Sequence, residues 1–323
     1  MTSSTSHHLY PHASKRAHAL GWLMAATVRP LASTLVRSPE GLMALRKTFR
    51  GLGTILKRSP KAVRITPVHQ ADVRGEWVVA ARAQEASRVV LYLHGGGYFF
   101  GSGALHRQVT WRLSDALARP VLAIDYRLAP RHSFEAWRDD AVSAYQHLLN
   151  QGYAGSDITV AGDSAGGHLT LVLLQTLRDR GISLPRAAIC ISPWTDLSGE
   201  SLALTANSRR DPYIPANALR FISRFLTRNR SPFDALVSPV HGDFRGLPPI
   251  YVMVGSTEIL RDDARRMVER ARSAGVSVRY EEWHRMPHVF PIMAAVLPEG
   301  RLAFRQMRDF IVRVEAPALS LVA

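Results

Sequence analysis

The 323-residue sequence contains only one cysteine, Cys190, which lies in the apolar run Ala187–Ile191. A single cysteine cannot form an internal disulfide, so folding does not depend on an oxidising compartment. On a buried strand a cysteine behaves as a small apolar residue, and we therefore do not assign Cys190 a catalytic role.

Long apolar runs are also missing, and none approaches the roughly 20 residues that a membrane-spanning helix requires. Residues 19–28 are apolar and follow Lys15 and Arg16, as the core of a signal peptide would. However, Arg29 and Pro30 interrupt this stretch and no clear cleavage site follows. We therefore expect a cytoplasmic protein.

Lysine is scarce, since only four of the 41 basic residues are lysine, and the net charge is +15. Residues 1–64 hold eleven basic residues against one acid, Glu40, so the excess is concentrated there. No nucleic-acid-binding motif accompanies it, and we expect no nucleic-acid partner. Weak contact of the basic N-terminal segment with a membrane surface stays open, beside the simpler interpretation that its arginines face water.

Apolar residues make up 46% of the sequence, enough for a large core. From about Glu76 onward, strand-like and helix-like segments alternate, which predicts an α/β fold with a mostly parallel central sheet wrapped by helices. The expected strands are 88–93, 120–125, 157–161, 187–191, 250–254 and 276–282, and the expected helices are 107–118, 136–150, 166–180 and 264–274.

Two segments do not follow this alternation. Residues 1–65 are basic and helix-like, and residues 199–234 contain a helix-like stretch at 215–227. We expect both to form a helical cap over the end of the sheet where α/β sites lie, with residues 66–323 as the main domain.

The strongest local motif is Gly162-Asp163-Ser164-Ala165-Gly166, which has the form G-x-S-x-G. It lies between a strand-like and a helix-like segment, and the flanking glycines permit the tight turn that exposes a strained serine hydroxyl. The sequence therefore predicts that Ser164 is a nucleophile.

A second motif, His94-Gly95-Gly96-Gly97, follows the apolar strand that ends at Leu93. Glycines let backbone N–H groups approach a substrate oxygen that gains negative charge during acyl transfer. No lysine and no phosphate-loop spacing occurs here, which argues against phosphate binding. The expected oxyanion donors are the N–H groups of Gly96, Gly97 and Ala165.

A base and its orienting acid should follow the serine, in the order acid and then histidine. His288 lies in the loop after the last strand and is the expected base, with His284 as the alternative. Glu258 lies nearest the end of strand 250–254 and is the expected acid, with Asp262 as the alternative.

Together these residues resemble the hormone-sensitive-lipase-like esterases (family IV) of the α/β-hydrolase superfamily. The resemblance covers about residues 89–290 and rests on five motifs: His94-Gly-Gly-Gly-Tyr98, Asp125-Tyr-Arg-Leu-Ala-Pro130, Gly162-Asp-Ser-Ala-Gly-Gly167, Ser192-Pro-Trp-Thr-Asp196 and His288-Val-Phe290. Where the family usually has the aspartate of a D-x-L-x-D segment, this chain has Glu258. The resemblance also implies an N-terminal cap, which agrees with the interpretation of residues 1–65.

The resemblance implies a serine carboxylesterase that hydrolyses short- to medium-chain acyl esters by a Ser-His-Glu triad through an acyl-enzyme, without a cofactor or metal. The expected partner is a small acyl ester, and a homodimer is a family-level expectation. Alternatives are an acylglycerol lipase at a membrane surface and a deacetylase or lactone hydrolase using the same site. A non-catalytic ligand receptor is the least favoured alternative, because all three triad members are present.

Overall fold

A nine-stranded sheet forms the centre of the molecule, in a computed structural model that describes residues 6–51, 58–70, 72–83, 87–199 and 206–316. The strand order is β1-β9-β8-β7-β6-β4-β5-β3-β2. Strands β2 and β3 pair antiparallel, as do β3 and β5, and all other neighbours are parallel. The sheet is therefore mostly parallel, as predicted.

The strands are β1 (Ser6–Tyr10), β2 (Arg64–Gln70), β3 (Val73–Val79), β4 (Val89–Leu93), β5 (Val121–Ile124), β6 (Ile158–Asp163), β7 (Ala187–Ile191), β8 (Ile250–Gly255) and β9 (Val278–Trp283). The six strands from β4 to β9 match the six predicted segments within two residues at every end. All six are buried along their whole length. Strands β4, β5, β7 and β8 accordingly read as continuous apolar runs, whereas β9 carries Arg279, Glu281 and Glu282, which are paired within the fold.

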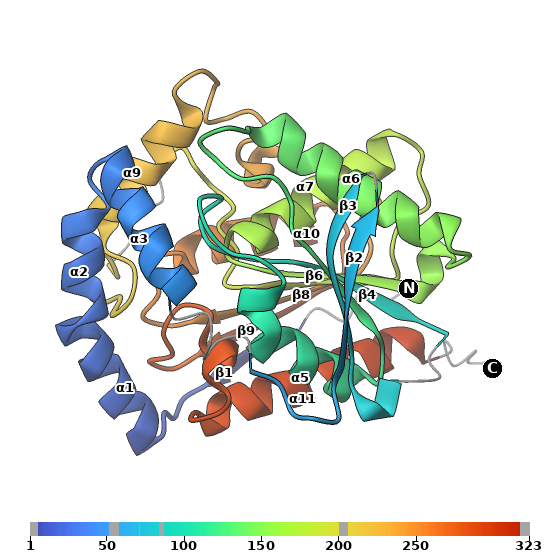
Figure 1. The fold of residues 1–323 in the computed structure, drawn as a ribbon, viewed down its shortest axis with the longest axis horizontal. Coiled ribbons are helices and arrows are strands. Elements are labelled where there is room, and N and C mark those ends of the chain that lie inside the picture. The colour runs from blue at the N-terminus through green and yellow to red at the C-terminus, as the bar shows by residue number, and fades with distance from the viewer. Residues whose placement is uncertain (1–5, 52–57, 71, 84–86, 200–205, 317–323) are drawn as a thin grey trace.

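Helices cover both faces of the sheet (Figure 1). They are α5 (Arg107–Leu117), α6 (Phe134–Asn150), α7 (Ala165–Asp179), α10 (Arg261–Ser273) and α11 (Pro298–Glu315). Alternate residues of β4 point to opposite faces. Leu91 and Leu93 pack with α6 and α7, whereas Val90 and Tyr92 pack with α5 and α11. The core is thus two apolar layers separated by the sheet.

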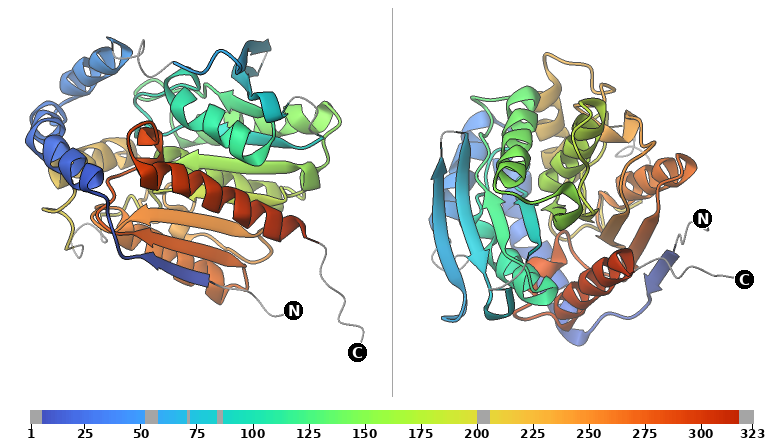
Figure 2. Two further views of the ribbon diagram at one scale, coloured as in Figure 1. Left: turned by 90° about the horizontal axis from the view of Figure 1, so that it is seen from below. Right: turned by 90° about the vertical axis from the view of Figure 1, so that its right-hand side faces the viewer.

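Four further helices lie together at one end of the molecule (Figures 1 and 2). They are α1 (Lys15–Ala26), α2 (Val28–Leu35) and α3 (Pro39–Gly51) of the N-terminal segment, and α9 (Ala216–Thr227) of the later insertion. Helix α2 is joined to α9 by hydrogen bonds between Ser33 and Asn217, at 3.1 and 2.9 Å. These are the two segments that we expected to form a cap. Residues 1–5, 52–57 and 200–205 of the two expected segments lie outside the described residues.

Three strands were not predicted. Strand β1 lies inside the segment expected to be helical, and it pairs with β9 at the sheet edge (Figure 2). Strands β2 and β3 form an antiparallel pair at the opposite edge. Strand β2 is mostly exposed and lacks an apolar alternation, so its sequence gives no strand signal. The division of the chain near residue 65 remains a prediction. No helix in the described ranges is long and apolar enough to cross a membrane.

Candidate active site

Ser164 lies in the turn that joins β6 to α7, with φ 53° and ψ −117°. This backbone conformation is strained for a residue with a side chain. The flanking glycines make the turn possible: a Cβ on Gly162 would lie 2.3 Å from the Gly166 carbonyl oxygen, and a Cβ on Gly166 would lie 1.9 Å from the Leu93 carbonyl oxygen. The G-x-S-x-G motif therefore adopts the strand-turn-helix geometry that the sequence predicts.

The glycine loop after β4 is held against this turn by Asp163. Its Oδ1 accepts hydrogen bonds from the Gly95 N–H at 2.9 Å and from the Tyr92 hydroxyl at 2.5 Å. Burial favours the neutral carboxyl, but the charge and hydrogen bond of His106, with the Tyr92 hydrogen bond, outweigh it and lower the pKa of Asp163. Positive φ angles of 115° at Gly96 and 59° at Gly97 turn the backbone of the loop back on itself.

His288 and Glu258 lie in direct contact. The Nδ1 atom of His288 is 2.8 Å from Oε2 of Glu258, and both side chains are buried. The other carboxylate oxygen, Oε1, accepts hydrogen bonds from the Ser192 hydroxyl at 2.7 Å and from the Gly255 N–H at 2.5 Å. Each carboxylate oxygen is therefore fixed, which fixes the imidazole ring in turn.

The end of β7 brings the serine turn and the histidine loop together. The Ser164 N–H donates to the Ile191 carbonyl at 2.8 Å, and the Val289 N–H donates to the hydroxyl of the next residue, Ser192, at 3.1 Å. Two segments that are more than a hundred residues apart thus bond to consecutive residues of one strand end. Ser164, Glu258 and His288 all belong to this one region.

The alternatives of the sequence analysis have other partners. Asp262 pairs with Arg261 at 3.0 Å, in the first turn of α10, and His284 is exposed. The nearest histidine in the sequence, His168 on α7, is not free to act as a base, because its ring nitrogens contact the Tyr98 hydroxyl at 2.5 Å and the Val237 carbonyl at 2.9 Å. Burial lowers the pKa of His168 to about 4. The geometry therefore favours Glu258 and His288.

Sequence reasoning missed the residues of the insertion that hold the acid turn. The amide nitrogen of Asn207 donates to the carbonyl oxygens of Ser256 at 2.6 Å and of Glu258 at 2.9 Å. Asp211 accepts the Ile259 N–H at 2.8 Å and is also buried. Neither residue lies in a motif that would identify it. A buried Asn and Asp in an otherwise polar stretch become visible only once the fold is known.

Electrostatics around His288 favour its protonated form. Burial opposes the charge, but the hydrogen bond and charge of Glu258 outweigh it and raise the pKa of His288 above its ordinary 6.5. The charges of Asp211 and Asp163 act in the same direction. Burial raises the pKa of Asp211 to about 6, although backbone N–H groups and His288 oppose this. The ring of Tyr213 stacks on His288 with 6.0 Å between centroids.

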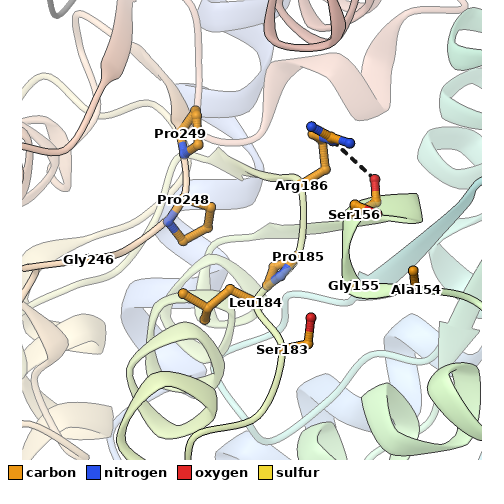
Figure 3. Close-up of a pocket in the computed structure, with 10 residues that line it drawn as sticks. All are labelled: Ala154, Gly155, Ser156, Ser183, Leu184, Pro185, Arg186, Gly246, Pro248 and Pro249. Carbon is orange, nitrogen blue, oxygen red and sulfur yellow. Dashed lines mark hydrogen bonds between the residues drawn. The ribbon is translucent and has the colours of Figure 1, made fainter. Parts of the chain in front are cut away.

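A separate open hollow of about 400 Å³ lies at the other end of the strands (Figure 3). Its walls are the turns that precede β6, β7 and β8, whereas Ser164 follows β6. Arg186 extends along one wall and donates to the Ser156 carbonyl at 3.1 Å. No group of three or more metal-ligating side chains suited to a metal ion is found in the described ranges. The hollow thus lies apart from the candidate site.

Comparison with known proteins places the chain in a family. A family profile described as the alpha/beta hydrolase fold matches residues 90–292. The crystal structure of an esterase from the bacterial hormone-sensitive lipase family is 36% identical, with a TM-score of 0.81, and the match covers 90% of this chain and 98% of that one. The chain belongs to the hormone-sensitive-lipase-like esterases of the α/β-hydrolase superfamily.

Other relatives of this esterase agree. An acetyl-hydrolase of Streptomyces hygroscopicus is 44% identical over 236 residues, which are 73% of this chain and 78% of that protein. An esterase of Acinetobacter venetianus is 35% identical over 289 residues, or 89% and 93% of the two chains. The crystal structure of EstE5, soaked with ethyl alcohol, has a TM-score of 0.86 and 32% identity, covering 94% and 99%. The esterase is accordingly a carboxylic-ester hydrolase.

Proposed function

We propose that the protein hydrolyses short- to medium-chain acyl esters by a Ser164–His288–Glu258 triad through an acyl-enzyme. The observation that carries this proposal is the 2.8 Å hydrogen bond between Glu258 and Nδ1 of His288. It makes Nδ1 the donor to the carboxylate and leaves Nε2 as the nitrogen that can act as a base toward Ser164.

In the first half-reaction the Ser164 oxygen attacks the ester carbonyl carbon, and Nε2 of His288 takes the hydroxyl proton. Negative charge develops on the former carbonyl oxygen, where the N–H groups of Gly96, Gly97 and Ala165 stabilise it. The N–H of Ala165 suits this role because the first residue of a helix has no intrahelical acceptor. The protonated His288 then donates its proton to the leaving alkoxide, and the alcohol departs.

In the second half-reaction water attacks the acylated Ser164. His288 takes a proton from that water and returns it to the serine oxygen as the carboxylic acid leaves. Glu258 accepts the Nδ1–H throughout, which holds the imidazole in the reactive tautomer and stabilises its charged form. All atoms come from ester and water, and no cofactor takes part.

Two features favour a small, uncharged acyl group. Ala165, next to Ser164, belongs to an apolar cluster that also contains Tyr98, Phe99 and Leu219, and apolar surface of this kind disfavours a charged acyl group. The names of two relatives, the acetyl-hydrolase above and an ethyl acetate hydrolase of Pseudomonas putida that is 31% identical over 222 residues, refer to acetyl esters. Acetyl and other short acyl groups are therefore the first substrates to try.

The test is hydrolysis of p-nitrophenyl esters from acetate to palmitate, with Ser164→Ala beside the wild type. We expect the highest rate for the shorter chains and a loss of about 10⁴- to 10⁶-fold in kcat in the variant. Circular dichroism and the melting temperature should stay unchanged. An unaltered rate in Ser164→Ala would refute the nucleophile, and a maximum at the longest chains would refute the substrate class.

A further inference from the structure

The outer surface of the N-terminal helices combines exposed apolar side chains with basic ones. Eight large apolar side chains are exposed in the described ranges, and four of these lie on α1, α2 and α3: Trp22, Leu23, Leu31 and Met43. Trp22 is 78% exposed and Leu23 is 59% exposed. Large apolar residues concentrated on one surface mark an interaction site.

Helix α1 has distinct inner and outer faces. Ala17 and Met24, seven residues apart, are its buried residues, so they define the face that packs on the protein. Lys15, Trp22 and Ala26 are exposed and lie on the opposite face, with Arg16 and Leu23 beside them. Two cations in the first turn are thus followed by an aromatic and an aliphatic side chain on the same outer face.

Helix α3 repeats this combination. Met43 and Lys47 are four residues apart and both are exposed, so they share a face. Glu40 also lies on this face and is the only acid among residues 1–64, which hold eleven basic residues. No ion pair of Lys15, Arg16 or Lys47 occurs within the part of the chain that the structure describes.

The inner sides of the same helices pack on both apolar layers of the core, since Ala17 of α1 belongs to the cluster on the side of α5 and α11. Val36 directly follows α2, and Leu42 and Leu45 lie on α3. All three belong to the apolar cluster that contains Tyr98 and Ala165. At the other end, Glu299 of α11 accepts hydrogen bonds from the N–H and hydroxyl of Ser14, which anchors the start of α1. The inner faces of these helices are therefore occupied by the protein, which leaves their outer faces for an external partner.

We propose that the outer face of α1 to α3 docks on an anionic lipid surface. Cations attract the acidic headgroups, and exposed tryptophan, leucine and methionine side chains enter the boundary between headgroups and acyl chains. A second copy of this chain fits less well, because the same basic surface would then meet itself.

For the reaction, docking would bring into contact with the lipid the helices whose residues Val36, Leu42 and Leu45 share an apolar cluster with Ala165. Uncharged acyl esters that dissolve in the membrane would then reach the site from the surface. This part of the inference rests on the proposed function, whereas docking itself does not.

The test is co-sedimentation of the full chain with vesicles of phosphatidylcholine alone or mixed with phosphatidylglycerol. We expect binding to the mixed vesicles at about 20 mM salt, and much weaker binding at about 200 mM salt or without the anionic lipid. The docking variant carries Lys15→Glu, Arg16→Glu, Trp22→Ser and Leu23→Ser, and it should bind at least about ten-fold more weakly.

A matched control changes the same kinds of side chain elsewhere. It carries Arg305→Glu, Arg313→Glu, Val296→Ser and Val312→Ser, all exposed and on or beside α11. Its total charge change equals that of the docking variant, and it should bind like the wild type. Equal losses in both variants would show attraction by net charge alone and would overturn the proposal, as would absence of binding at low salt.

Two further measurements separate the remaining outcomes. Sedimentation equilibrium of the wild type and the docking variant should give the same mass, and a dimer that the variant dissociates would assign the surface to a second copy instead. The Ser164→Ala protein should still bind vesicles even if the proposed catalytic role fails. With the proposed function intact, the docking variant should hydrolyse soluble p-nitrophenyl acetate normally but lose rate on p-nitrophenyl octanoate dissolved in anionic vesicles.

Discussion

The Oδ1 atom of Asp163 accepts the backbone N–H of Gly95 at 2.9 Å, and this contact ties the turn before Ser164 to the glycine loop after β4. The two segments lie 68 residues apart in the sequence, on neighbouring strands β6 and β4. The second residue of the serine motif, Asp163, thus sets the position of the loop that is proposed to stabilise the oxyanion. Small displacements of that loop should cost activity, because donors must meet the oxyanion at hydrogen-bond distance.

Replacing Gly95 by alanine should displace the glycine loop. A Cβ at this position would lie 2.1 Å from Oδ2 and 2.9 Å from the backbone oxygen of Asp163. We expect kcat for p-nitrophenyl butyrate to fall at least about ten-fold, together with a lower melting temperature.

Gly21→Ala in α1 is the control, because apart from its chain neighbours and the backbone of its own helix no heavy atom lies within 4 Å of its Cβ position. It should keep full activity and gain about 0.5–1 kcal/mol of stability, since alanine favours the helix. Normal activity in Gly95→Ala would contradict the role of the Asp163 contact.

Changing Glu258 to glutamine should lower kcat by about 10³- to 10⁴-fold, because the amide can present a donor to Nδ1 of His288 and favour the wrong tautomer. The matched control is Asp262→Asn. Asp262 pairs with Arg261 on the surface of α10, and its loss should leave kcat within about two-fold. The reverse result would identify Asp262 as the acid.

The pH dependence of kcat/KM should report the titration of His288. The proposed base works only as neutral imidazole, so activity is lost as pH falls through its pKa. Because that pKa is raised, the midpoint of the acid limb should lie above 6.5. In Glu258→Gln the midpoint should move to lower pH. Rates from about pH 5 to 9 with p-nitrophenyl butyrate test this, and a wild-type midpoint below 6.5 would contradict it.

Replacing Asn207 by alanine should loosen the acid turn. The carbonyl oxygens of Ser256 and Glu258 would lose their amide donor, at a cost of about 1–3 kcal/mol in stability. We expect kcat to fall about ten-fold with little change in KM, since the acid would hold His288 less firmly.

The pH profile separates this positioning role from simple destabilisation. In Asn207→Ala the acid limb should move to lower pH, as the Glu258 contact that raises the pKa of His288 weakens. Asn217→Ala, which removes the exposed contact with Ser33, is the control and should leave the profile in place. An unchanged profile in Asn207→Ala would limit Asn207 to structural support.

The parts of the molecule that the sequence predicts are those whose signals are local. Strands β4, β6 and β8 are buried on both faces and each is followed at once by a candidate residue or motif, so the order along the chain gives the order in space. The turn geometry at Ser164 follows from its two glycines. For the same reason Glu258, directly after β8, could be preferred to Asp262 in the helix.

The parts that could not be predicted depend on contacts distant in sequence. Asn207 and Asp211 hold the acid turn from about fifty residues away, and no local pattern marks them. Strand β1 reads Ser-His-His-Leu-Tyr, without the apolar alternation of a strand, and it takes its conformation from its partner β9. Pairing of this kind is a tertiary effect that overrides local propensity.

The pairing of β1 with β9 also limits when the edge of the sheet can form during synthesis. Residues Ser6–Tyr10 leave the ribosome long before Val278–Trp283, yet β9 is the neighbour of β1 in the sheet. Strand β1 therefore has no partner in the sheet until β9 has been translated. Contacts of such long sequence separation form slowly, and an uncovered strand edge invites other chains. A nascent chain stalled before β9 would thus be the species most in need of a chaperone.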